Sequence, residues 1–210
     1  MKGLIMDYPL TTNTILEYGN SVYYHKKIIT HLPDGTRHEY RFGDMYKRCK
    51  KLANALTQKL GISKDDIVGT FAWNHSSHVE LYYGISGIGA ICHPINIRLS
   101  SQQTEFIINN SEDEVIFVDA TLVPHLEKIA PLLKTVEHYV LINASKDFKT
   151  TLQNTLHYED LLAAQSEDFD WPTLNENSAS GLSYTSGTTG FPKGVLYSHR
   201  STFLHATTIM

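Results

Sequence analysis

Cysteine is scarce in this chain of 210 residues, and the two that occur, Cys49 and Cys92, do not form a CxxC motif. Their scarcity argues against a disulfide framework and a thiolate zinc site, and it suits the reducing cytoplasm. No apolar run approaches the ~20 residues that a membrane-spanning helix needs. The apolar run at the first residues is too short for a secretory signal. These absences predict a soluble cytoplasmic protein without a transmembrane segment.

An excess of positive charge is also lacking. The chain has 18 Lys and Arg residues against 22 Asp and Glu residues, a formal net charge of −4, which gives no reason to expect nucleic acid as a partner. One local basic group occurs at helical spacing, and it consists of Lys47, Arg48, Lys50 and Lys51. We interpret this group as the solvated face of a helix, with contact to an anion as the alternative.

The first third of the chain contains a hairpin signal followed by a helix signal. Residues 22–32 and 37–42 are rich in strand-forming side chains and flank the turn sequence Pro33-Asp34-Gly35-Thr36. Apolar residues then recur at helical spacing between Met45 and Leu60. Gly61 is placed to end that helix in a left-handed conformation.

Strands and helices alternate in the middle of the chain. Short apolar runs predict strands at residues 67–73, 90–95, 115–118 and 139–142. Periodic segments between them predict helices at residues 77–89, 100–110 and 122–133. This alternation predicts an α/β fold with a largely parallel sheet flanked by helices.

Local signals refine two of these helices. Ser77 with Glu80, and Ser100 with Gln103, match the capping-box pattern at a helix start. Three glycines follow in the first of the two helices, and we expect them to let it approach a sheet closely; they are Gly84, Gly87 and Gly89.

The last third of the chain ends in two short strands around a loop. A short helix is expected at residues 159–164 and a loop at 169–178, before β-like runs at 182–184 and 195–197. A further helix is expected to begin near His199 or Ser201. We therefore divide the chain into a first α/β subdomain, residues 1–178, and a strand-loop-strand motif with the start of the next helix, residues 179–210.

The loop between these two strands carries the most informative sequence, Tyr-Thr-Ser-Gly-Thr-Thr-Gly-Phe-Pro-Lys-Gly at residues 184–194. Its glycines permit tight turns in which main-chain N–H groups converge on an anion. Its hydroxyl groups are further donors and possible oxygen ligands of Mg²⁺. Lys193 supplies a positive charge for a phosphate oxygen. This combination is typical of a loop that binds a polyphosphate.

The loop is not a Walker A motif, because Pro192 precedes Lys193, Gly194 follows it, and the residues beyond look extended rather than helical. An ordinary flexible surface loop would account for the small residues. It would not account for the Pro-Lys-Gly sequence that follows them.

The same eleven residues resemble the signature loop of the adenylate-forming superfamily, which includes acyl-CoA synthetases, luciferases and peptide-synthetase adenylation domains. Upstream segments resemble the medium- and long-chain fatty-acyl-CoA synthetase branch. They are Trp73-Asn74-His75, Glu80-Leu81-Tyr82 and the run from Gly89 to Ser100 with its Asn96-x-Arg98-Leu99 sequence. The similarity covers nearly the whole chain from about Tyr8.

This resemblance implies a two-step reaction. A carboxylate, here a fatty acid, attacks the α-phosphorus of ATP to give acyl-AMP and pyrophosphate, and the thiol of CoA then displaces AMP. The loop would hold the phosphates of ATP with Mg²⁺. By motif position the phosphate-contacting residues would be Thr185, Ser186, Gly187, Thr188, Thr189, Gly190 and Lys193. Thr188 matches the position of a hydroxyl associated with Mg²⁺, with a plain phosphate contact as the alternative.

The resemblance also implies that parts of such an enzyme are absent here. The downstream aromatic-Gly-x-Thr-Glu segment, the ribose-binding Asp and the C-terminal domain with its catalytic Lys are not found, so we name no catalytic residue. The 210 residues are therefore expected to be the first, incomplete part of the N-terminal domain. The alternatives are a non-catalytic fragment that self-associates through exposed sheet edges, or a ligase whose acceptor is not CoA.

Four further residues are weighed individually. His75 and His78 lie three apart near a helix start without a carboxylate at ligand spacing, so structural or surface roles are favoured over metal binding. His199 and Arg200 follow the second strand of the loop motif and could approach a nucleotide. A role as helix cap or surface residue is favoured for them.

Overall fold

The computed structural model of the chain describes residues 5–6, 8–32, 35–185 and 191–209. At its centre lies a seven-stranded sheet in the order β7-β6-β5-β3-β4-β8-β9. These strands are β3 (Ile67–Phe71), β4 (Ile91–Pro94), β5 (Val115–Asp119), β6 (His138–Ile142), β7 (Thr155–His157), β8 (Ala179–Thr185) and β9 (Lys193–Ser198). All neighbours are parallel except β8 and β9, which pair antiparallel. The predicted α/β fold with a largely parallel sheet is confirmed, whereas the division of the chain at residue 178 stays a prediction.

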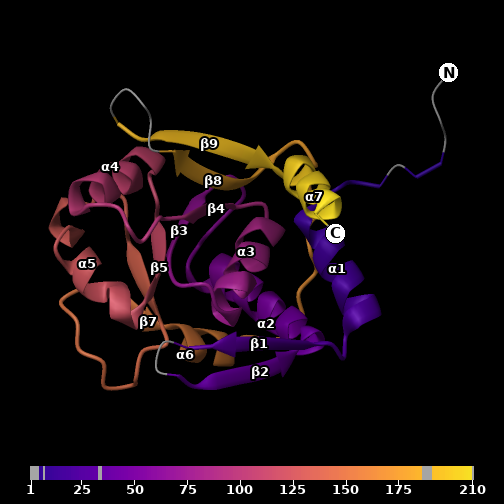
Figure 1. Cartoon of the computed structure of the whole chain (residues 1–210), viewed down its shortest axis with the longest axis horizontal. Coiled ribbons are helices and arrows are strands. Elements are labelled where there is room, and N and C mark those ends of the chain that lie inside the picture. The colour runs from indigo at the N-terminus through magenta and orange to yellow at the C-terminus, as the bar shows by residue number, and fades with distance from the viewer. Residues whose placement is uncertain (1–4, 7, 33–34, 186–190, 210) are drawn as a thin grey trace.

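Helices cover both faces of the sheet (Figure 1). One side carries α4 (Ser101–Ser111) and α5 (Val123–Glu127), and the other carries α2 (Phe42–Asn54) and α3 (Ser76–Gly87). Successive strand residues therefore enter two different cores: Val115 and Phe117 of β5 join the core on the α2/α3 side, and Ile116 and Val118 join the other. Burial on both faces explains why these strands are short runs of apolar residues without alternation.

The N-terminal region differs from its prediction. Residues 12–23 form α1 (Thr12–Tyr23), and the Thr11 side chain caps this helix by accepting a hydrogen bond from the Thr14 N–H. Val22 therefore lies in a helix, not in a strand. The predicted hairpin is confined to β1 (Lys27–His31) and β2 (Arg37–Arg41), and the turn residues Pro33 and Asp34 lie outside the described residues.

The start of α3 corrects one capping prediction. The residue that caps α3 is His75, whose side chain accepts a hydrogen bond from the His78 N–H. Ser77 lies inside the helix, and Glu80 is buried instead of reaching back to the helix start. The other predicted capping box, Ser100 with Gln103 at the start of α4, is confirmed.

The glycines of α3 permit close packing against helices and loops rather than against the sheet. A Cβ atom at Gly84 would lie 2.5 Å from Leu52 Cδ2 of α2, and one at Gly87 would lie 2.6 Å from the Trp171 ring. Gly61 has a φ of +71° and follows a π-helical turn, Ala55–Lys59, at the end of α2. Its predicted left-handed conformation is confirmed.

The remaining helices are short. The helix predicted at residues 122–133 is divided into a 3₁₀ turn (Ala120–Leu122), α5, and a second 3₁₀ turn (Ala130–Leu132) that contains Pro131. Two further helices are α6 (Tyr158–Ala163) and α7 (His199–Thr208). Among the described residues, no helix is both long enough and apolar enough to cross a lipid bilayer.

Candidate functional site

The predicted phosphate-binding loop connects β8 with β9 at one edge of the sheet (Figure 1). Thr185 and Lys193 are register partners at the end of this hairpin, and the Thr185 hydroxyl donates a hydrogen bond of 3.5 Å to the Lys193 carbonyl. The structure thus brings together two of the seven predicted contacts. The other five, Ser186, Gly187, Thr188, Thr189 and Gly190, lie outside the described residues, and so does the predicted Mg²⁺ position at Thr188.

The loop leaves β8 at the carboxyl end of a parallel strand. In open α/β sheets, ligands bind outside the carboxyl ends of the strands. The segments after β3 and β6 also meet at the carboxyl ends of the strands, where the carboxylate of Asp119, the last residue of β5, accepts hydrogen bonds from the Trp73 N–H (2.7 Å), His75 Nε2 (2.9 Å) and the Asn143 amide (2.9 Å). Asp119 is buried and ties these loops to one another.

Both histidines near the start of α3 are engaged within the protein. Nε2 of His75 is bound to Asp119, and Nδ1 accepts from the His78 N–H. Nε2 of His78 lies 3.0 Å from the Thr70 hydroxyl, and Nδ1 lies 3.1 Å from the Trp73 carbonyl. Burial lowers the pKa of His78 below its ordinary value. These contacts support the structural role that was favoured for His75 and His78.

Tyr184, the residue before the loop, is held on the α4 side of the sheet. Its hydroxyl donates a hydrogen bond of 2.7 Å to the Asn110 side-chain oxygen, and its ring lies 5.2 Å from the His93 ring. His93 and Asp113 are both fully buried, and His93 Nδ1 lies 3.0 and 2.9 Å from the two oxygens of the Asp113 carboxylate. Burial raises the pKa of Asp113, and the hydrogen bond with His93 opposes that change.

His93 was not singled out from the sequence, although it lies in the run from Gly89 to Ser100 that carries the resemblance. Nothing in its spacing distinguishes a buried histidine paired with Asp113 from one at the surface. Its Nε2 atom is buried and has no partner among the described residues. The His93–Asp113 pair therefore forms a buried polar layer beside the Tyr184 ring.

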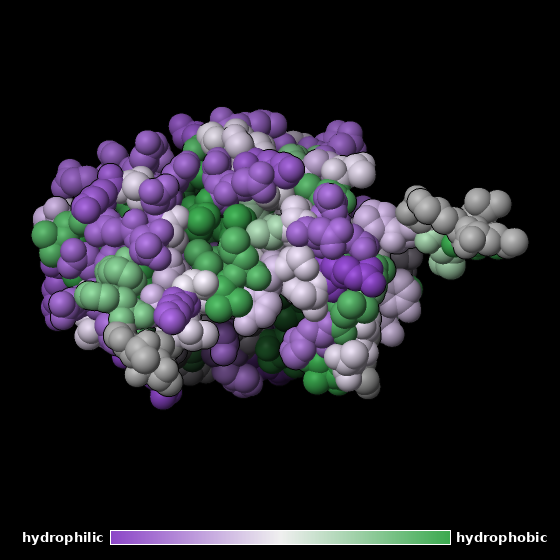
Figure 2. All heavy atoms as spheres, turned by 90° about the horizontal axis from the view of Figure 1, so that it is seen from above, coloured by the Kyte–Doolittle hydropathy of each residue, from purple (hydrophilic) through white to green (hydrophobic). Residues whose placement is uncertain are grey.

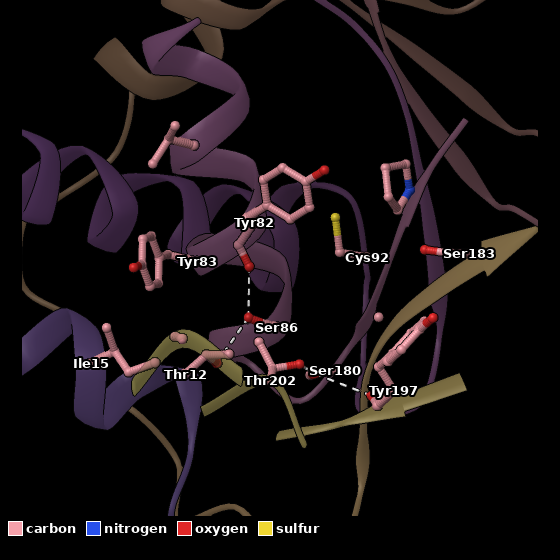
Figure 3. Close-up of a pocket in the computed structure, with 14 residues that line it drawn as sticks. Thr12, Ile15, Tyr82, Tyr83, Ser86, Cys92, Ser180, Ser183, Tyr197 and Thr202 are labelled. Carbon is pink, nitrogen blue, oxygen red and sulfur yellow. Dashed lines mark hydrogen bonds between the residues drawn. The ribbon is translucent and has the colours of Figure 1, made fainter. Parts of the chain in front are cut away.

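A pocket of about 380 Å³ lies on the opposite face of β8 (Figure 3). It is bounded by α1, α3, the β8–β9 hairpin and α7, and no charged side chain is among the described residues that line it. Four of its hydroxyl groups are paired with one another, because Thr12 contacts Ser86 at 2.9 Å and Ser180 contacts Thr202 at 3.2 Å. Such a surface accommodates an uncharged, apolar group and offers a charged one no compensation.

The basic group on α2 is not uniformly solvated as predicted. Lys47 and Lys51 form ion pairs with Glu167 at 3.5 and 3.8 Å. Arg48 lies between two carboxylates, at 2.9 Å from the buried Glu80 and 2.7 Å from Glu159. The anions that this group contacts thus include carboxylates of the protein itself.

His199 is fully buried, so the surface role proposed for it is wrong. Its Nδ1 lies 3.1 Å from the Thr12 hydroxyl, and burial lowers its pKa to about 4. The residue that caps α7 is Ser198. Arg200 is partly exposed and pairs with Glu176 at 2.6 Å.

Comparison with known protein families gives a match over most of the chain. A model described as AMP-binding enzyme matches residues 20–210. The chain is 41% identical to 3-methylmercaptopropionyl-CoA ligase of Ruegeria lacuscaerulensis over 98% of its own length and 38% of the relative's. It is 37% identical to a medium-chain-fatty-acid–CoA ligase of Ectopseudomonas oleovorans, over 99% of its length and 38% of the relative's.

Solved structures agree with these matches. The anthranilate CoA ligase AuaEII, solved with anthranoyl-AMP, superposes with a TM-score of 0.82 at 26% identity over 95% of this chain and 37% of the other. A long-chain-fatty-acid-CoA ligase from Archaeoglobus fulgidus has the same TM-score at 23% identity, which shows the fold alone, over 97% of this chain and 40% of the other. The chain therefore spans less than half the length of these relatives.

Proposed function

The chain belongs to the family of AMP-binding enzymes, and we propose that it forms the first part of an ATP-dependent ligase that activates a carboxylate and transfers it to coenzyme A. In the first step a carboxylate oxygen attacks the α-phosphorus of ATP, which gives acyl-AMP and releases pyrophosphate. In the second step the thiol of CoA attacks the acyl carbon and releases AMP. ATP, Mg²⁺ and CoA are the cofactors of this proposal.

The observation that carries the proposal is the pairing of Thr185 with Lys193 at the end of the β8–β9 hairpin. The pair brackets a segment of glycine and hydroxyl residues at an edge of the sheet where ligands bind. Directly paired residues in an antiparallel pair share a face, so the Thr185 hydroxyl and the Lys193 ammonium point to the same side. That side is suited to the terminal phosphates of a nucleotide and to the leaving pyrophosphate.

Within this function, the residues assigned to the phosphates are Thr185, Ser186, Gly187, Thr188, Thr189, Gly190 and Lys193, with Thr188 beside Mg²⁺. They follow from the motif, and Thr185 and Lys193 have in addition the geometry described above. When bound beside Thr188, Mg²⁺ would supply positive charge that offsets the charge of the departing pyrophosphate.

A fatty acid is the carboxylate that we propose. Two relatives are named for medium-chain and long-chain fatty acids, and the uncharged pocket beside β8 is compatible with an apolar acyl group. The proposal extends to a cytoplasmic location, supported by two cysteines that are both free and buried.

A second candidate is a non-catalytic chain that self-associates. It is favoured by β9, an edge strand whose apolar residues Val195, Leu196 and Tyr197 are exposed. Figure 2 looks onto this edge and shows hydrophobic residues gathered near its centre. Sedimentation of the 210-residue chain tests this candidate, because a monomer at all concentrations excludes it.

Pyrophosphate release tests the ligase in the whole protein. We expect release that requires ATP, Mg²⁺ and a fatty acid together, and formation of an acyl thioester when CoA is added. Lys193→Ala should reduce the rate about 100-fold, as expected for loss of one charged transition-state contact. Lys149→Ala, an exposed lysine between β6 and β7, is the matched control.

Three results would count against parts of the proposal. An unchanged rate in Lys193→Ala would exclude the assigned role of the loop. Pyrophosphate release without thioester formation would point to an acceptor other than CoA. Rapid turnover of short or aromatic acids with no turnover of fatty acids would refute the fatty-acid substrate but would leave the proposed ligase reaction in place.

A further inference from the structure

Both flanks of the predicted phosphate-binding segment contact α4. On the β8 side, the Tyr184 hydroxyl donates a hydrogen bond of 2.7 Å to the Asn110 side chain. On the β9 side, the Phe191 ring stacks on the Phe106 ring with centroids 4.7 Å apart and an interplanar angle of 28°. Phe106 and Asn110 are four residues apart on α4 and therefore lie on the same face of this helix.

We propose that α4 is a two-point clamp that positions the phosphate-binding hairpin for ATP, with Phe106 and Asn110 as its positioning residues. The expected effect on ATP rests on the proposed function, whereas the two contacts of α4 do not depend on it. Neither residue belongs to the loop motif, and neither contacts the reacting atoms in this proposal. Their effect on ATP is exerted through Tyr184 and Phe191.

The clamp needs a rigid support, and α4 provides one. Its first turn is closed by the Ser100–Gln103 capping box, and its inner face buries Ile107 and Ile108. Near its end, the Asn109 side chain donates to the Leu132 carbonyl at 3.1 Å and accepts from the Lys134 N–H at 2.9 Å. A helix held at its start, its inner face and its end transmits little of its own motion to the hairpin.

Tyr184 is supported from a second direction. The buried His93 ring lies 5.2 Å from the Tyr184 ring, and His93 is itself bound to the buried Asp113. The tyrosine is thus fixed at its hydroxyl by Asn110 and at its ring by His93. Its position determines where the chain enters Thr185.

The Phe191 contact is notable because this residue is 66% exposed. An exposed phenylalanine contributes little to the core, and the ring contact that the structure gives Phe191 is the stacking with Phe106. Fixing both flanks in advance reduces the ordering that ATP binding must cause. The physical consequence is a lower KM for MgATP, with a smaller effect on kcat.

The test uses two double-mutant cycles in the whole protein, with KM for MgATP as the readout. Phe106→Ala, Phe191→Ala, Asn110→Ala and Tyr184→Phe should each raise KM about threefold to tenfold, the factor that one aromatic pair or one hydrogen bond gives. Phe106→Ala should add almost nothing in the Phe191→Ala background, and Asn110→Ala almost nothing in the Tyr184→Phe background. Phe106→Tyr, which keeps an aromatic ring at this position, should have the same KM for MgATP as the wild type.

The matched control is Gln102→Ala, an exposed change one turn before Phe106 that removes neither contact. It should leave KM unchanged. Effects on KM that multiply within each pair would overturn the clamp, because they would show that the partners do not act through each other. An unchanged KM in all four single variants would overturn it as well.

A failure of the proposed function is distinguishable from a failure of the clamp. If the whole protein shows no ATP-dependent activity, the same cycles are measured as shifts in the thermal midpoint of the chain. Phe106→Ala should then shift the midpoint less in the Phe191→Ala background than in the wild type. Equal shifts of the midpoint in the wild type and in Phe191→Ala would show that the ring contact is absent and would refute the inference.

Discussion

Replacement of Glu80 by glutamine is expected to destabilise the fold far more than its conservative shape suggests. Glu80 is 1% exposed, and its carboxylate accepts hydrogen bonds from the Tyr40 hydroxyl (2.8 Å), Arg48 Nε (2.9 Å) and the Tyr158 hydroxyl (2.7 Å). These contacts join α3 to β2, α2 and α6. A neutral amide offers one acceptor oxygen to three donors and places its own N–H₂ group against one of them.

The magnitude follows from what remains around Arg48. Breaking a buried ion pair costs roughly 3–5 kcal/mol, because the remaining charge is left uncompensated. Arg48 is 27% exposed and keeps its contact with Glu159, so the lower end of that range, about 3 kcal/mol, applies. Glu159 itself is 68% exposed, and Glu159→Gln should cost below about 1 kcal/mol.

Urea unfolding at pH 7 measures this difference. The midpoint of Glu80→Gln should fall by about 1 M or more at an unchanged slope, whereas that of Glu159→Gln should move little. Absorbance titration gives an independent reading, because burial and then the charge of Glu80 raise the pKa of Tyr158. Loss of that charge should lower this pKa. Equal midpoints for the two variants would refute the reasoning that Glu80 is a buried charge on which Arg48 depends.

Three further outcomes are expected. Gly84→Ala should destabilise the fold by about 1–3 kcal/mol in urea unfolding despite the better helix propensity of alanine, because the new Cβ would lie 2.5 Å from Leu52. The double variant with Leu52→Ala should lose less stability than the sum of the two single variants. Burial lowers the pKa of His199 to about 4, so below pH ~6.5 the unfolded chain takes up a proton that the folded chain does not. Thermal stability should therefore fall by up to about 3 kcal/mol between pH ~6.5 and ~4, and His199→Gln should flatten that decline. Cys49 and Cys92 are buried with pKa values raised by burial, that of Cys92 to about 12, so a thiol reagent at pH 8 should label neither in the folded chain and both in denaturant.

Sequence periodicity located the central strands β3 to β6, because they are buried on both faces, but it did not predict the less buried β7. Runs such as residues 115–118 are apolar without interruption, and the structure places β5 there. The capping box at Ser100 was equally readable, since all of its partners lie within four residues. The loop at residues 184–194 was found by composition, which does not depend on the rest of the fold.

Features that depend on residues far apart in the sequence could not be predicted from the sequence. The strand-forming residues Val22 and Tyr23 lie in α1, where Thr11 caps the start and burial of Leu16 fixes the inner face. Glu80 matched a capping pattern, yet Tyr158, 78 positions away in the sequence, binds its carboxylate. The same holds for His93 and Asp113, whose pairing exists only once β4 and the end of α4 are adjacent. Spacing in the sequence carries no signal for such contacts.

The alternation of side chains along β8 connects the loop to its support. Gly181 and Ser183 line the uncharged pocket on the α3 side, whereas Tyr184 contacts Asn110 and His93 on the α4 side. Thr185 returns to the pocket side by alternation, and its register partner Lys193 shares that face. A slip of one residue would turn Tyr184 away from α4 and would turn Thr185 to the opposite face at the same time. The contact of α4 with Tyr184 therefore also determines on which side of the sheet Thr185 and Lys193 lie.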